Sequence, residues 1–322
     1  MITALTFDDA GAFSKALSQS NVVCMQTLPG AVQFKLDILT FPELELHLTT
    51  MPVGGCIALG DAARDSVSFH VPLSEEGSLS LLGMSADASG LAAYAMGGEL
   101  AVQARGGARL AYIVPNSRSL PDLYRILFED DDPKHARKTH RVSVEAGELN
   151  KLKTLLNEIA RVVEMSPAAF SNPAMARNLQ QSVLGQVFAV AGKQVQSLAP
   201  FGRAQRAHAQ IVKKVHDYLL QLPGEPVFVL DVCRAMGISQ PTLFRAFRQT
   251  LGIGPKEYLQ IRRLHLSRQR LLHDPDPAVS VHAVAYDLGF WHLGRFGSAY
   301  RAMFGEMPSR TLRRREGRRG RA

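Results

Sequence analysis

The chain has 322 residues, of which 46% are hydrophobic and 20% are charged, and its formal net charge is +8. This length suits two domains with hydrophobic cores of their own. Its three cysteines, Cys24, Cys56 and Cys233, lie far apart without a CxxC pair, so neither a disulfide framework nor a structural zinc site is indicated. The sequence shows no signal peptide and no apolar run long enough to span a bilayer, so we expect a soluble cytoplasmic protein.

The charge is unevenly distributed between the two halves. Residues 203–322 carry 21 Lys and Arg against 9 Asp and Glu, a net +12, whereas residues 1–202 carry 16 against 20, a net −4. A basic half of this kind attracts phosphates without regard to sequence and makes binding salt-dependent. The closing run RRREGRRGRA is predicted to be a disordered, solvated tail.

Residues 1–120 have the pattern of short β-strands separated by turns. Apolar or alternating runs such as VQFKLDILTF, LELHLTTM, SVSFHVPL and ELAVQA are punctuated by Gly, Pro, Asp and Ser. The run GGELAVQARGGARLAYIVP is typical of a late hairpin. This half is therefore predicted to form a small β-sandwich or barrel.

The hairpin contains a short basic motif, Arg105-Gly-Gly-Ala-Arg109. It resembles the RxxxR step by which some proteins hold cyclic dinucleotides, because two guanidiniums that flank glycines could each pair with a phosphate. The alternative, and the commoner explanation of so short a motif, is a hairpin turn with two exposed arginines.

The sequence offers no evident catalytic or metal-binding cluster. His47 and His70 stand alone in their predicted strands without an HxH pair, and a lone histidine in a strand is usually structural. There is no GxSxG, no Walker loop, and no GxGxxG between a strand and a helix. We therefore predict no catalytic residues, no metal and no cofactor.

Residues 121–200 change to helical spacing. Two amphipathic helices are predicted, and the start of the second is marked by Asn172-Pro173. Their apolar stripes are Leu149, Leu152, Leu156, Ile159 and Val163 in the first helix, and Met175, Leu179, Val183, Val187 and Val190 in the second. The following run SLAPFG has the Pro and Gly of a linker, which places a domain boundary near residue 201.

The last third contains one helical pattern twice, with its turn glycines, Gly237 and Gly289, 52 residues apart. In each copy a short apolar stripe precedes the glycine, and a second helix with large apolar residues follows it. The stripes are Val229, Val232, Cys233 and Met236, then Val281, Val284, Ala285 and Leu288; the second helices carry Leu243, Phe247 and Leu251, then Phe296, Tyr300 and Phe304. Short helix, glycine turn and second helix together form the helix-turn-helix pattern.

The outward positions of both second helices offer donors and cations without a carboxylate, which suits a polyanion. They are Gln240, Thr242, Arg245, Arg248 and Gln249 in the first copy, and His292, Arg295, Ser298 and Arg301 in the second. The alternative is an ordinary all-helical domain with no role in DNA binding, because helix pairs broken by glycine are common in protein cores.

The residues GISQPTLFRAFRQTLGIGPKEYLQIRRLHLSRQRLL, followed by GFWHLGRFGSAYRAMFGEMPS, resemble the DNA-binding domain of the AraC/XylS family of bacterial transcription regulators. The resemblance rests on the Gly-x-Ser turn, GxxPxxYL, the pair Arg263–Leu264, the second GF and the closing FGxxPS. It implies a linker helix from about Pro255 to Leu272 between two helix-turn-helix units. The runs LGIGP and GFWHLGRF resemble, more narrowly, activators of ethanolamine-utilisation operons.

The resemblance implies an α+β fold with four segments. They are a cupin-like β-barrel or sandwich that senses a ligand (1–120), a helical segment whose second helix could form a dimer or simply cover the barrel (121–200), a DNA-binding domain (201–316) and a basic tail (317–322). The expected partners are double-stranded promoter DNA, RNA polymerase, a second copy of the chain through its N-terminal half, and a small-molecule effector, with an amine or amino alcohol as the first guess. No membrane partner is expected.

Matching positions also imply the DNA contacts. Arg245 and Arg295 are the strongest candidates for bidentate contacts to guanine. Base edges are expected to meet Gln240, Pro241, Thr242 and Arg245 in the first unit and Leu293, Gly294, Arg295 and Ser298 in the second; phosphates are expected to meet Arg248, Arg262 and Arg301. Pro241 and Trp291 depart from the polar residues usual at their places.

Three other functions stay open at this stage. A β-barrel enzyme fused to a DNA-binding tail would need a catalytic or metal cluster in residues 1–120. A regulator that responds to a cyclic dinucleotide would use Arg105 and Arg109. A nucleoid-type binder driven by charge alone would show a steep salt dependence with little difference between DNA sequences.

Overall fold

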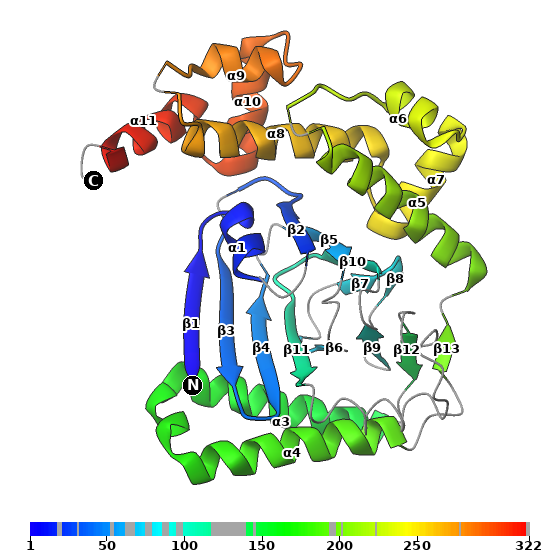
Figure 1. Ribbon diagram of the computed structural model, residues 1–322, viewed down its shortest axis with the longest axis vertical. Helices are drawn as coiled ribbons and strands as arrows, with labels where there is room; N and C mark the ends of the chain where they lie inside the picture. The colour runs from blue at the N-terminus through cyan, green and yellow to red at the C-terminus, as the bar shows by residue number, and fades with distance from the viewer. Residues whose placement is uncertain are drawn as a thin grey trace.

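The computed structural model describes the whole chain except residues 18–20, 31, 52–54, 62–67, 75–78, 86–89, 95–98, 117–139, 144–145, 193–197, 201, 223, 277 and 320–322. A β-rich N-terminal half, with two long helices on one side, supports a helical C-terminal half on the other (Figure 1). In the described part of the chain, no helix is both long and apolar enough to cross a membrane.

The larger sheet has eight antiparallel strands in the order β1-β3-β4-β11-β6-β9-β12-β13. Their bounds are β1 (Ile2–Phe7), β3 (Phe34–Thr40), β4 (Leu44–Thr50), β6 (Ser68–Pro72), β9 (Gly90–Tyr94), β11 (Arg109–Pro115), β12 (His140–Ser143) and β13 (Leu198–Pro200). The predicted strands from residue 32 onward are found here or in the second sheet, whereas β1, β12 and β13 were not predicted.

The smaller sheet has five strands in the order β2-β5-β10-β7-β8. They are β2 (Asn21–Gln26), β5 (Cys56–Asp61), β7 (Leu79–Leu81), β8 (Met84–Ser85) and β10 (Glu99–Ala104). Side chains from both sheets pack into one cluster, to which Leu36 and Leu110 contribute from the larger sheet and Cys24 and Val102 from the smaller. Short helix α1 (Ala10–Ala16) adds Phe13 to this core.

The two sheets form a sandwich rather than a closed barrel. No ladder of hydrogen bonds between the described residues joins one sheet to the other, and each sheet keeps its own edge strands. Of the two predicted architectures, the cupin-like closed barrel is therefore not found. The reason lies in pairings between distant segments: β12 and β13, far along the chain, extend the larger sheet beyond β9 instead of closing it onto the smaller one.

Helices α3 (Ala146–Met165) and α4 (Pro173–Gly192), linked by the 3₁₀ turn η2 (Pro167–Ser171), cover the outer face of the larger sheet (Figure 1). Asn172 starts α4 as predicted, because its side chain accepts from the amide of Ala174 at 2.9 Å. The stripe of α4, including Val183 and Val187, is buried with Leu46 of β4. The predicted stripe is thus used to cover the sheet, and the outward face of α4 is polar.

The C-terminal half consists of helices throughout its described length. They are α5 (Arg203–Leu220), α6 (Val229–Met236), α7 (Gln240–Leu251), α8 (Pro255–His273), α9 (Val281–Asp287), α10 (Leu293–Phe304) and α11 (Pro308–Arg319). Helix α8 is the expected linker helix, and α6–α7 and α9–α10 lie towards its opposite ends (Figure 1). We call α6–α7 unit one and α9–α10 unit two.

Helix α11 corrects the prediction of a disordered tail. The chain stays helical through Arg319, and Arg315 is buried, with its guanidinium donating to the carbonyl of Asp276 before α9. A run of arginines looks solvated in the sequence, but here one of them ties the last helix to the loop that leads into unit two.

Candidate nucleic-acid interface

Unit one is shaped by a cap, a turn and a buried stripe. Gly237 ends α6 in the left-handed conformation, with φ of +63°, which favours glycine at a tight turn. Ser239 then caps α7 by accepting from the amide of Thr242. Leu243 and Phe247 are fully buried. The opposite face of α7 is consequently left to solvent.

Unit two repeats this construction. Ser280 caps α9 by accepting from the amide of Ala283 at 3.1 Å. The buried side of α10 is a row of aromatic rings, in which the ring centroids of Phe296 and Tyr300 are 5.6 Å apart and those of Tyr300 and Phe304 are 4.7 Å apart. These contacts fix which face of α10 points outward.

The outward faces hold nearly all the residues for which DNA contacts are predicted. Both arginines proposed for guanine contacts, Arg245 and Arg295, are exposed. The other exposed members of the predicted set are Gln240, Pro241, Thr242, Leu293, Gly294 and Ser298 for the bases, and Arg248 and Arg301 for the phosphates. The predicted contact residues thus lie on two separate exposed surfaces, one on each unit.

Arg262 is the exception, and its placement does not fit a phosphate contact. It is only 8% exposed, and its guanidinium donates to the carbonyls of Leu219 and, at 3.1 Å, Leu222. Helix α5, for which no prediction was made from the sequence, supplies the first of these acceptors at its C-terminal end. Arg262 is therefore a residue that ties α8 to α5.

The neighbouring Arg263 fixes unit one relative to unit two. Its guanidinium lies over the ring of Phe228, which precedes α6, and over that of Phe290, which follows α9, at 5.5 and 5.1 Å from the ring centroids. It also donates to the carbonyl of Gly289 at 3.4 Å. One side chain of the linker helix thus contacts the edges of both units.

Sequence reasoning missed Phe244 on the recognition surface of unit one. Its side chain is 38% exposed and follows Thr242 on the outward side of α7. The stripe formed by Leu243, Phe247 and Leu251 already indicated that Phe244 lies off the buried face. The sequence signal that could have identified Phe244 is therefore its position outside this stripe.

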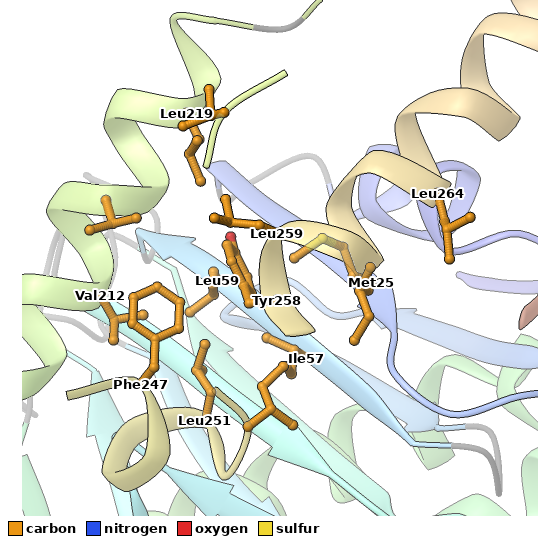
Figure 2. Close-up of a cluster of buried hydrophobic side chains, with 14 of the residues drawn as sticks. Met25, Ile57, Leu59, Val212, Leu219, Phe247, Leu251, Tyr258, Leu259 and Leu264 are labelled. Atoms are coloured by element: carbon orange, nitrogen blue, oxygen red, sulfur yellow. The ribbon is translucent and has the colours of Figure 1, made fainter. Parts of the chain in front are cut away.

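Unit one also rests on the N-terminal half through an apolar contact. Met25, Ile57 and Leu59 of the smaller sheet share one buried cluster with Leu251 and Tyr258 (Figure 2). Gly83 permits this close approach, because a Cβ at this position would lie 2.2 Å from the carbonyl oxygen of Gln249.

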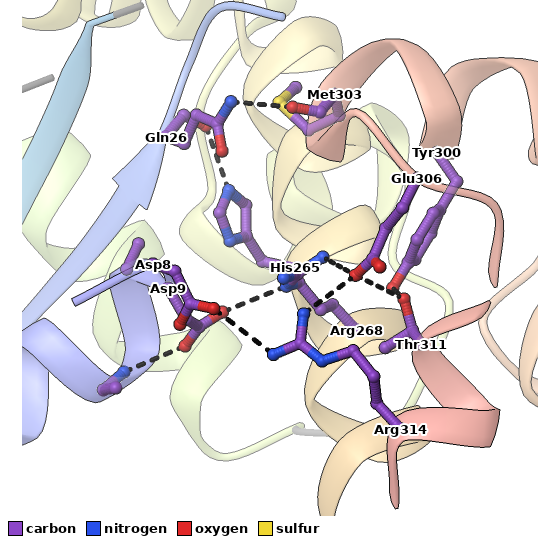
Figure 3. Close-up of polar contacts among 12 residues, drawn as sticks. Asp8, Asp9, Gln26, His265, Arg268, Tyr300, Met303, Glu306, Thr311 and Arg314 are labelled. Atoms are coloured by element: carbon purple, nitrogen blue, oxygen red, sulfur yellow. Dashed lines mark hydrogen bonds and ion pairs between the residues drawn. The ribbon is translucent and has the colours of Figure 1, made fainter. Parts of the chain in front are cut away.

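Unit two and the adjoining part of α8 meet the N-terminal half through polar contacts (Figure 3). Arg268 of α8 is 5% exposed; its guanidinium lies 3.3 Å from the carboxylate of Asp9 and 2.9 Å from that of Glu306. The side-chain amide of Gln26 donates to the carbonyl of Met303 at 2.7 Å. The carbonyl of Gln26 in turn lies 3.0 Å from Nε2 of His265, whose pKa is lowered by burial.

The interior of the sandwich brings together the two histidines that look isolated in the sequence. Antiparallel pairing places Tyr112 of β11 directly between His47 of β4 and His70 of β6. Nε2 of His47 lies 3.1 Å from a carboxylate oxygen of Glu45, and the rings of His70 and Tyr112 meet edge to face at 4.4 Å. Burial, with a smaller contribution from His47, lowers the pKa of His70 to about 3.

This polar row has no evident metal-binding geometry. No group of three or more His, Cys, Asp or Glu that could hold a metal ion occurs in the described part of the chain. The row instead offers donors, acceptors and ring faces inside a β-sandwich. The pairing register of β4, β11 and β6 brings these side chains together, and that register cannot be read from the sequence alone.

Arg105 and Arg109 flank the turn between β10 and β11. Nη2 of Arg105 lies 2.8 Å from the point that a Cβ on Gly252 would occupy, so this arginine faces the turn between α7 and α8. The backbone amide of Arg109 donates to Ser74 at 3.0 Å. The pair therefore sits on a hairpin, and Arg105 belongs to the contact with unit one.

Comparison with known proteins agrees with this geometry. Residues 232–314 match a family model described as "Helix-turn-helix domain". The chain is 29% identical over 170 residues to XylDLEGF operon transcriptional activator 1 of Pseudomonas putida, which is 52% of this chain and 49% of that protein. It is 36% identical over 103 residues to a probable thc operon regulatory protein of Rhodococcus erythropolis, covering 32% of this chain and 31% of that protein.

A solved structure, that of a probable AraC family transcriptional regulator from Rhodopseudomonas palustris, is 33% identical, with a TM-score of 0.30. The match covers 33% of this chain and 97% of that one. The chain spans about half the length, or less, of the curated relatives it matches.

Two helix-turn-helix units on one linker helix, each with a cationic outer face, are the features of a helix-turn-helix DNA-binding domain. More narrowly, the C-terminal part of the chain is similar to proteins named as transcriptional activators and operon regulators, and to one described as a probable AraC family transcriptional regulator. None of the relatives named above is described as an activator of an ethanolamine operon, so this narrower resemblance stays a prediction.

Proposed function

We propose that the chain is a sequence-specific activator of transcription that inserts α7 and α10 into successive major-groove segments on one face of a duplex. The observation that carries this proposal is the exposure of Arg245 and Arg295 on two units whose spacing is fixed by α8 and Arg263. Helices held in this way suit two sites about one DNA turn apart, near 34 Å. Its curated relatives, which are named as operon activators, support the direction of regulation.

The test is equilibrium binding of the full chain to DNA from its own upstream region and to scrambled duplexes of equal length. We expect the cognate fragment to bind at least about a thousandfold more tightly at physiological salt. Equal affinity for all duplexes, lost on addition of salt, would instead indicate a binder driven by charge alone.

Single substitutions separate the roles within the interface. Arg245→Ala and Arg295→Ala should each cost on the order of 1–3 kcal/mol on the cognate site and relax one base position. Arg248→Ala should weaken binding to all sequences alike and reduce the salt slope by about one. Arg262→Ala is the control for structure, because it should lower the unfolding temperature rather than change base preference.

We place the effector in the interior of the sandwich, at the row of His47, Tyr112 and His70 beside Glu45. A carboxylate beside hydroxyl and imidazole groups suits a small amine or amino alcohol, since the carboxylate can pair with an ammonium group. Calorimetry with ethanolamine, with ethylene glycol as the uncharged analogue, tests this. Binding of ethanolamine alone, abolished by Glu45→Gln, is expected; equal binding of both compounds would count against the charged contact.

A cyclic dinucleotide is the second candidate effector. The position of Arg105 beside the turn at Gly252 favours it, because an anion held there would touch unit one. Titration with cyclic di-GMP, in wild type and in Arg105→Ala and Arg109→Ala variants, decides between the two effectors. Heat released by the wild type and lost in both variants would move the effector site to the hairpin.

Assembly and recruitment complete the proposal. We expect a homodimer through the N-terminal half, but not through the apolar stripe of α4, because that stripe is buried against the sheet. Sedimentation at micromolar concentration measures this. Activation further requires contact with RNA polymerase, which in vitro transcription from the cognate promoter would detect.

A further inference from the structure

The start of the recognition helix differs chemically between the two units. Helix α7 begins with Gln240, whose amide can donate and accept, whereas α10 begins with Leu293. Leu293 is 44% exposed, and Trp291, two residues before it, is 61% exposed. Near them, Ser298 already donates its hydroxyl proton to the carbonyl of Gly294 at 2.9 Å. His292 and Arg295 are the exposed hydrogen-bonding side chains beside them, so Trp291 and Leu293 form the apolar part of this surface.

The exposed tryptophan is held in place by a neighbouring ring. Trp291 meets Tyr286 of α9 edge to face, with centroids 5.2 Å apart and an interplanar angle of 87°. Tyr286 is itself 58% exposed, so both rings and the Leu293 side chain present apolar area to water. Burying such area against a partner is favourable at roughly 25 cal/mol per Å². The patch therefore has the character of a contact surface.

The charge around the patch identifies the kind of partner. Arg295 and Arg301 are exposed on the same helix, in a half of the chain with a net charge of +12. An apolar patch among cations suits a polyanion that also displays apolar groups. In the major groove of DNA the apolar group on a base edge is the 5-methyl of thymine. Gly294, beside Leu293, has open space where a side chain would be, which allows a duplex to approach closely.

We propose that Trp291 and Leu293 form an apolar edge by which unit two selects thymine through its 5-methyl group. The inference rests on the proposed function, because it requires α10 to enter a major groove. Trp291 then contributes to base specificity, and Leu293 contacts the 5-methyl group of thymine. Unit two then reads one base step by shape and methyl contact, while Arg295 reads another by hydrogen bonds.

The test uses the full chain and its cognate site, mapped by footprinting. Thymines in the half-site protected by unit two are replaced one at a time by deoxyuridine, which lacks only the methyl group. Loss of a contacted methyl should weaken binding about fourfold, the value expected for one buried methyl-sized group. Leu293→Ala and Trp291→Ala should bind the thymine and uracil duplexes alike. Arg295→Ala is the matched control: it should weaken both duplexes and keep their ratio.

The outcomes separate this inference from the proposed function. If the unmodified site is not preferred over scrambled DNA, the proposed function fails. If the site is preferred but every uracil duplex binds like its thymine counterpart, the methyl contact alone is overturned. Because Leu293 and Trp291 are exposed, their substitution should leave the unfolding temperature nearly unchanged, which checks that the variants are folded.

Fluorescence provides an independent measurement, since Trp291 is the single tryptophan in the chain. Cognate DNA should change its emission and protect it from acrylamide. If Trp291 stays fully accessible on DNA, and Trp291→Ala impairs transcription without changing DNA affinity, the patch contacts a protein and the proposal is wrong.

Discussion

The two helix-turn-helix units are held to the N-terminal half by different forces. Unit one shares a buried apolar cluster with the smaller sheet, for example through Leu251 and Ile57. Unit two and the adjoining end of α8 are joined to it by polar contacts, such as the hydrogen bond between Gln26 and Met303 of α10 and the ion pair between Arg268 of α8 and Asp9. The side chains of Arg268 and Asp9 are only 6% and 14% exposed, so salt screens this ion pair far less than a surface pair. The exposed pair of Asp8 with Arg314 is the one that salt should weaken.

Strand β2 contributes to both contacts at once. Met25 packs into the apolar cluster beside unit one, and the next residue, Gln26, binds the carbonyl of Met303 in unit two. A shift of this strand would therefore act on both units. A change in the sandwich would therefore reach the two proposed DNA-binding surfaces by different contacts.

The largest effect is expected from Phe247→Ala in unit one. Phe247 is fully buried and meets Tyr258 edge to face at 5.2 Å, so its truncation should cost roughly 3–5 kcal/mol. Chemical denaturation measures this cost. Phe244→Ala, on the same helix but exposed, is the control and should change stability by no more than about 0.5 kcal/mol. An unchanged midpoint for Phe247→Ala would contradict an apolar anchor for unit one.

Arg268→Met tests the polar contact with unit two. The substitution removes the buried cation that pairs with both Asp9 and Glu306, although Glu306 keeps Arg314 at 3.4 Å, and we expect a loss of about 3 kcal/mol. Adding Asp9→Asn should restore part of this loss. If Arg268→Met is as stable as the wild type, the ion pairs do not hold unit two in place.

Acid should lower the stability of the packing between α5 and α8, because it protonates His216. The Nδ1 of His216 lies 2.9 Å from the hydroxyl of Tyr258, and burial, opposed in part by Asp217, lowers its pKa to about 4. The unfolded chain therefore binds this proton first, so stability is complete above about pH 6.5 and falls towards pH 4, by at most about 3 kcal/mol. Unfolding of His216→Gln across this range should show a flatter pH dependence; an equal slope would exclude His216 as its source.

Gly83→Ala should separate unit one from the smaller sheet. Gly83 has φ of +80°, and the added Cβ would collide with the backbone of Gln249, so we expect a cost of roughly 1–3 kcal/mol. Hydrogen exchange at residues 246–253 should become faster. Gly30→Ala serves as the control, because Gly30 also has a positive φ, +122°, but has open space around it. Unchanged protection in Gly83→Ala would show that the contact tolerates a shift.

The smallest effect is expected from Asp8→Asn. Asp8 pairs with Arg314 at 3.3 Å, but its side chain is 73% exposed, so the pair should contribute less than about 1 kcal/mol. Stability measured at low and high salt should differ between wild type and variant only at low salt. A larger effect, independent of salt, would mean that the outer ion pairs of unit two matter as much as the buried one.

Much of the recognition surface could be predicted from the sequence. The period of the α-helix sets which residues share a face, so the stripe of Leu243, Phe247 and Leu251 already assigned Arg245 to the outside. The turn glycines, Gly237 and Gly289, then indicated where the first helix of each unit ends. The buried face and the ends of a helix depend on residues only a few positions apart, so a local sequence pattern is enough to predict them.

Tertiary structure decided the rest. Arg262 turned inward because α5 brings carbonyl groups to it, and His47 and His70 met because β11 lies between their strands. The contacts between the halves, such as Gln26 with Met303, join residues 277 positions apart. Local periodicity specifies the shape of each element and its buried face, but not its partner, because partners are set by how the buried faces pack together.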